Sequence, residues 1–87
     1  MTAGYRLTPK AREGFHRIVF YVEEHFGLEV ADRVITDLEK AFELLAANPD
    51  VGHHREDLTR DEHVLFWSVG PTLIAYRSSP EWVEILF

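Results

Sequence analysis

Apolar residues recur at helical spacing soon after the start of the chain. They fall three or four positions apart: Ala11, Phe15, Ile18, Val22 and Phe26. This spacing is typical of the buried stripe of an amphipathic helix. Thr8 suits the N-cap, and Pro9 suits the first helical position, where its missing N–H would be unpaired in any case. Gly27 is a frequent helix terminator, so we predict a helix over residues 9–26.

A second helical pattern follows at once. Its apolar positions are Val30 or Ala31, Val34, Ile35, Leu38, Ala41 or Phe42, and Leu45. This helix must end before Pro49, because a residue that precedes proline is pushed out of the helical region. Since so few residues separate the two patterns, the helices are expected to fold back as an antiparallel hairpin.

The period changes after Gly52, where β-branched and aromatic residues alternate with other side chains. The expected strands are Val64 to Val69, Leu73 to Arg77, and Trp82 to Phe87. Gly70-Pro71 and Ser78-Ser79-Pro80 form the turns between them. Turns this short imply an antiparallel meander.

A short alternating segment, Tyr5 to Leu7, precedes the first helix and is expected to pair at a sheet edge or beside a non-sequential neighbour. The predicted fold is α+β, in the order β-α-α-β-β-β, with the helical hairpin packed on an antiparallel sheet. The whole chain, residues 1–87, is expected to form one domain, with Leu38 and Ile85 both buried in its core.

The predicted sheet is apolar on both faces, whereas a helical hairpin covers only one. We expect Leu65, Trp67 and Trp82 to lie bare on the second face. A partner segment would cover them, together with Val19 and Phe20 on the hairpin, because exposed apolar patches usually mark interaction sites. The alternative is burial by a loop or by self-association.

Composition narrows the function classes. The 87 residues are 46% hydrophobic and 28% charged, as in ordinary folded proteins, and none is cysteine. No apolar run approaches the ~20 residues that span a bilayer, and the N-terminus lacks a signal-peptide core, so we expect a cytoplasmic protein without membrane contact. Nine basic against fifteen acidic residues give a net charge of -6, which disfavours direct binding of nucleic acid.

Catalysis of RNA cleavage without a metal needs a general acid, a general base and cations near the phosphate. His63 and Arg77 are the candidates for these roles. The surrounding carboxylates would repel RNA: Glu56, Asp57, Asp61 and Glu62. The charge pattern therefore favours a binding function over a ribonuclease.

The five histidines show no metal-ligand spacing. His16 and His25 are nine residues apart on one helix, roughly 180° around it, so they do not share an ion. His53 and His54 are adjacent, and neither they nor His63 match a zinc motif. We expect no metal and no cofactor, and we interpret the stretch around the paired histidines as a hinge between hairpin and sheet.

Several motifs follow one another in a characteristic order and spacing. They are Leu7-Thr8-Pro9-Lys10-Ala11, the break at Gly27, "NPDVGHHREDL" after the second helix, and "VLFWSVGPTLIAYR" in the meander. Together these motifs resemble the ParE/RelE superfamily of bacterial type II toxins, and ParE more than RelE. The resemblance implies a toxin that a cognate antitoxin neutralises with a flexible segment. It also implies DNA gyrase as the target of ParE-like members, and ribosome-dependent mRNA cleavage for RelE-like members.

The departures from this family concern basic residues. His53 and His54 stand where arginine or lysine is common, Val64 to Phe66 lacks an arginine, and Pro71-Thr72 replaces a basic turn. Family members usually continue with a basic tail, whereas this sequence ends at Phe87, so we expect this form to be less toxic than an extended one.

The hypothesis that these observations favour is a ParE-like toxin that acts by binding protein. A RelE-type endonuclease, or a degenerate toxin that only binds antitoxin, are the alternatives. The oligomeric state and the antitoxin's identity stay open.

Overall fold

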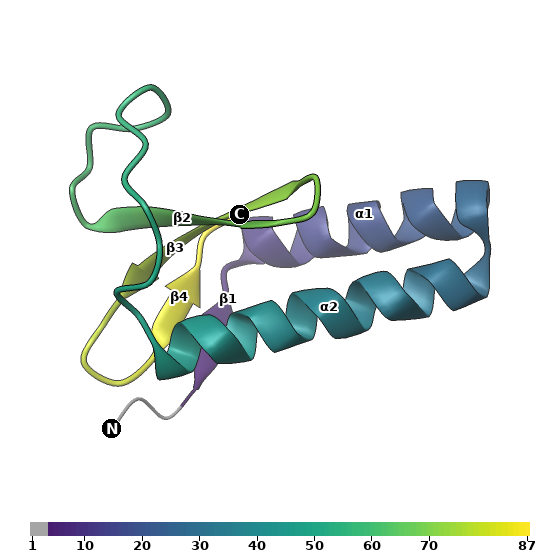
Figure 1. Cartoon of the computed structure of the whole chain (residues 1–87), viewed down its shortest axis with the longest axis horizontal. Coiled ribbons are helices and arrows are strands. Elements are labelled where there is room, and N and C mark those ends of the chain that lie inside the picture. Colours follow the sequence, from purple (N-terminus) through teal and green to yellow (C-terminus); the bar gives the residue numbers. More distant parts are fainter. Residues whose placement is uncertain (1–3) are drawn as a thin grey trace.

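Two helices and four strands follow one another in the predicted order in the computed structural model, which describes residues 4–87 (Figure 1). They are β1 (Tyr5–Leu7), α1 (Pro9–Phe26), α2 (Leu28–Ala47), β2 (Val64–Val69), β3 (Thr72–Ser78) and β4 (Val83–Ile85). The α+β fold class is therefore confirmed. Of the single domain expected over residues 1–87, the first three residues lie outside the described part.

The four strands form one sheet in the order β1-β4-β3-β2. The meander from β2 to β4 is antiparallel as predicted. β1 joins its edge beside the non-sequential β4, but it runs parallel to β4, so the sheet is mixed and the expectation of an antiparallel sheet is corrected. No tight turn joins β1 to β4, and a hairpin turn is the connection that requires antiparallel pairing.

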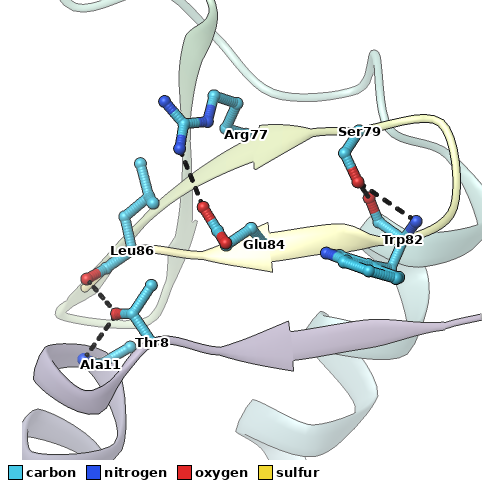
Figure 2. A network of polar contacts seen from close by, with 7 residues as sticks. All are labelled: Thr8, Ala11, Arg77, Ser79, Trp82, Glu84 and Leu86. Carbon is cyan, nitrogen blue, oxygen red and sulfur yellow. Dashed lines mark hydrogen bonds and ion pairs between the residues drawn. The ribbon is translucent and has the colours of Figure 1, made fainter.

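Thr8 links the start of α1 to the end of the sheet (Figure 2). Its Oγ1 accepts a hydrogen bond from the Ala11 backbone N–H at 3.1 Å and donates one to the Leu86 carbonyl at 3.0 Å. The first contact caps the helix. The second fixes the helix to the chain segment that follows β4, so this one side chain sets where α1 leaves the sheet.

The helical hairpin turns at Gly27, whose φ of 90° is a conformation that only glycine adopts without strain. One residue therefore separates α1 from α2. The helices pack on one face of the sheet, and their shared core is formed by Ala11, Leu38, Ala41, Phe42, Leu45, Ile74, Tyr76, Val83 and Ile85. The predicted burial of Leu38 and Ile85 is confirmed, with 3% and 2% of their surfaces exposed.

The side chains of β2 take the opposite faces from those expected. Leu65 lies opposite Tyr76 and Trp67 opposite Ile74, and both pack against the core under the hairpin. Val64 and Phe66 occupy the outer face instead. The expectation that Leu65 and Trp67 are bare on the second face is therefore wrong. Alternation along a strand separates two faces, but it does not say which face is covered when both are apolar.

The outer face is also better covered than predicted. Val64, Phe66 and Ala75 form a second buried cluster, against which Leu73 and Leu86 pack. The loop after α2 adds to the sheet here, since His53 exchanges two backbone hydrogen bonds with Phe66, each 2.8 Å long. The side of β2 that has no strand neighbour is thus partly paired.

Candidate partner-binding surface

The helical hairpin extends beyond the sheet. With 18 and 20 residues, α1 and α2 are about 27 and 30 Å long at ~1.5 Å per residue. Figure 1 shows both helices continuing past the turn between β2 and β3, so that the last turns of α1 and the first turns of α2 have no sheet beneath them. Large apolar side chains gather at this end, where Phe20, Tyr21, Phe26 and Leu28 are 64%, 55%, 63% and 66% exposed.

A groove of about 360 Å³ lies between this end of the hairpin and the β2–β3 turn. We call it the distal groove; its lining comprises Ile18, Tyr21, Val22, Phe26, Val34, Asp37, Leu38, Val69, Gly70, Pro71 and Thr72. The α1 members are spaced at three- and four-residue intervals, which places them on one helix face. This face continues the core stripe of α1, but past the edge of the sheet it borders open space.

Asp37 is the only charged side chain in this lining. It is exposed, and among residues 4–87 its carboxylate has neither a hydrogen bond nor an ion pair. The distal groove is therefore an apolar surface with one free negative charge.

The segment between α2 and the sheet is held by the side chain of Tyr76. The Tyr76 hydroxyl donates a hydrogen bond to the Pro49 carbonyl at 2.9 Å and accepts one from the Gly52 N–H at 2.8 Å. A Cβ atom on Gly52 would lie 2.7 Å from Tyr76 Cε1, so only glycine fits there. Burial raises the pKa of the Tyr76 phenol, and the Asp50 carboxylate raises it further. The hinge predicted from sequence is thus a fixed connection.

The loop histidines take separate roles. The His53 ring stacks on Trp67, with 6.2 Å between the ring centroids. The His54 Nε2 lies 3.0 Å from the Glu62 carbonyl oxygen. Within residues 4–87, no three His, Asp or Glu side chains are grouped so that they could hold a metal ion.

The two candidate catalytic residues lie close along the backbone, since His63 precedes Val64 and Val64 pairs with Arg77, but their side chains make different contacts. His63 is exposed and lines a shallow depression with His54, Glu56 and Glu62. The Arg77 guanidinium lies on the outer sheet face, 2.9 Å from the Glu84 carboxylate (Figure 2). The Glu84 carboxylate thus neutralises the positive charge with which Arg77 would bind a phosphate. Arg77 is also not part of the lining around His63.

The five residues predicted for partner contact do not form one patch. Val19 is half-buried on α1 beside the exposed Phe20. Leu65 and Trp67 are half-buried against the core. Trp82 is half-buried near the β3–β4 turn, where Ser79 Oγ donates to its carbonyl (Figure 2) and the Arg6 guanidinium lies 4.5 Å from its ring centroid.

Sequence reasoning missed the distal groove, because Ile18, Val22 and Phe26 read as part of an ordinary core stripe. One signal could have revealed it. Predicted helices of about 18 residues are longer than predicted strands of six, at ~1.5 and ~3.3 Å per residue. A sheet of that length leaves one end of the hairpin without cover.

Within the described residues, neither helix is long and apolar enough to cross a membrane.

Comparison with known proteins places this architecture in a family. The family described as "ParE toxin of type II toxin-antitoxin system, parDE" matches residues 5–86. The curated protein "Toxin ParE1" of Caulobacter vibrioides is 30% identical over 73 residues, with 76% of each chain covered. The chain therefore belongs to the ParE family of toxins from type II toxin–antitoxin systems.

Proposed function

We propose that this toxin acts in the cytoplasm by binding a protein target, with DNA gyrase the target that its family implies, and that an antitoxin segment neutralises it by covering the distal groove. The observation that carries this proposal is the overhanging end of the hairpin. Phe26 and Tyr21 are more than half exposed there and line a groove with Val22 and Val34. Full burial of such a side chain contributes about 1.5–3 kcal/mol, which a partner that covers the groove would gain.

The five residues predicted from sequence for partner contact would contribute unequally to binding of the antitoxin. Phe20, exposed beside the groove, and Val19 belong to the same end of α1. Leu65 and Trp67 already pack against the core, so a partner gains little from them. Trp82 lies at the far end of β4 and would need a separate part of the antitoxin, which fits a flexible segment that wraps a large surface.

The engagement of Arg77 by Glu84, away from the depression that His63 lines, supports binding over RNA cleavage. A general acid–base pair must lie within hydrogen-bond reach of one substrate, and here the arginine is paired with Glu84 instead. The net charge of -6 also works against phosphate binding.

The test measures DNA supercoiling by purified gyrase with and without the toxin, and mRNA cleavage on translating ribosomes in parallel. We expect loss of supercoiling and intact mRNA, with His63→Ala leaving both results unchanged. Codon-specific cleavage that disappears in the His63→Ala variant would establish the RelE-type alternative.

Growth assays separate the third alternative. Expression of the toxin should arrest growth, and co-expression of the protein encoded beside it should restore growth. Stable binding of that protein without any growth arrest by the toxin alone would mean that only antitoxin binding survives in this chain.

A further inference from the structure

The distal groove carries a single charged side chain. Its lining is apolar except for the carboxylate of Asp37, which is unpaired among the described residues. The two basic residues of α2, Arg33 and Lys40, lie about one helical turn from Asp37 on either side, but neither forms an ion pair with it. A segment that binds here meets an apolar floor and one carboxylate at the rim.

An occupant changes the environment of this carboxylate. In the free toxin Asp37 is exposed and solvated. A segment laid along the groove would remove water from it, and an ionised carboxylate that loses water without gaining a partner weakens binding. A cation in the occupant would instead form a partly shielded ion pair, which is stronger than a solvent-exposed one.

The groove also selects the secondary structure of its occupant. Two of its walls are helices, whose interior backbone groups are already paired. Its third wall is the β2–β3 turn, where Pro71 has no N–H to donate. Addition of a strand needs free backbone donors and acceptors, so side chains must carry the contact. A helix with an apolar stripe meets that condition.

We propose that the antitoxin segment in the distal groove is an amphipathic helix with a lysine or arginine against Asp37, and that Asp37 selects the cognate antitoxin by this charge. This inference rests on the proposed neutralisation through the groove. It adds the chemistry of the partner and names the residue that discriminates between partners.

The experiment displays a library of helical peptides of about 14 residues, roughly 21 Å long, with apolar residues at positions i, i+3, i+4 and i+7 and randomised flanks. The library is selected on the whole toxin and on its Asp37→Lys variant. Selected peptides are then measured by fluorescence polarisation against both proteins, against Phe26→Ser, and against Asp32→Lys. Asp32 is exposed on the same helix and lies outside the groove lining, so it is the matched charge control.

We expect the toxin to enrich helices with a lysine or arginine on one flank, and Asp37→Lys to enrich glutamate or aspartate there. A peptide selected on the toxin should bind Asp37→Lys about tenfold more weakly or worse. It should lose affinity for Phe26→Ser and bind Asp32→Lys within about twofold.

Two results would overturn the inference. One is a set of binders without charge preference, or an equal loss with Asp32→Lys, because the carboxylate would then have no special role. The other is a set of binders indifferent to Phe26→Ser, or no binders at all, because the groove would then not receive a helix. Neither result affects the gyrase and growth assays, which test the proposed function independently.

Discussion

The two ends of the helical hairpin have the same apolar periodicity and very different surroundings. At the proximal end, over the sheet, Phe42 and Leu45 are 4% and 0% exposed. At the distal end, past the β2–β3 turn, Phe26 and Leu28 are 63% and 66% exposed, and the buried helix residue there is the small Ala31, at 2%. An apolar stripe on a helix thus predicts that this face is buried, but it does not say against what. Whether the sheet or another protein covers the face depends on how far the sheet reaches.

The largest expected contrast is between two phenylalanines. Phe42→Ala should lower the free energy of unfolding by about 3–5 kcal/mol, because it empties a buried site next to the rings of Tyr5 and Phe15. Phe26→Ala should change it by no more than about 0.5 kcal/mol, since its side chain is mostly in solvent. Urea denaturation measures both. Similar losses for the two variants would mean that the distal end belongs to the core.

The hinge at the proximal end should show a smaller effect. Gly52→Ala should cost about 1–3 kcal/mol, because the new methyl group overlaps the buried Tyr76 ring. Gly14→Ala is the control, since a Cβ there meets nothing within 4 Å and alanine favours a helix by about 0.5–1 kcal/mol. Thermal unfolding should therefore move in opposite directions for the two variants. Stabilisation by both would show that the loop is free to shift away from Tyr76.

The smallest effect concerns the cap that joins α1 to the sheet. Thr8→Ala removes the acceptor for Ala11 and the donor to Leu86, and it should cost about 0.5–2 kcal/mol. Thr8→Ser keeps the hydroxyl and should recover most of that loss. Hydrogen exchange adds detail, since amides in the first turn of α1 should lose protection before those near Gly27 do. An equal loss of protection along all of α1 would contradict a local role for this cap.

Much of this fold could be predicted from local signals. Pro9, Gly27 and Pro49 mark helix ends by backbone chemistry alone, and the change of period after Gly52 separates helices from strands. The parallel pairing of β1 could not be predicted, since three residues carry no signal for a partner 78 positions away. The covered face of β2 was mispredicted, because Leu65 and Trp67 are as apolar as Val64 and Phe66. The distal groove exists because the helices are longer than the strands. A pattern that is followed one residue at a time does not compare the lengths of two elements.

The pairing of β1 with β4 also has a consequence for biosynthesis. Thr8 contacts Leu86, 78 residues later, so the sheet cannot close until the ribosome has added those residues, which takes roughly 4–16 s at ~5–20 residues per second. The helical hairpin depends on local contacts and forms far sooner, within about microseconds of leaving the ribosome. During synthesis the apolar face of the whole hairpin, and not only its distal end, is therefore accessible. A nascent toxin should be recognised by apolar-binding partners before it has the structure of the finished protein.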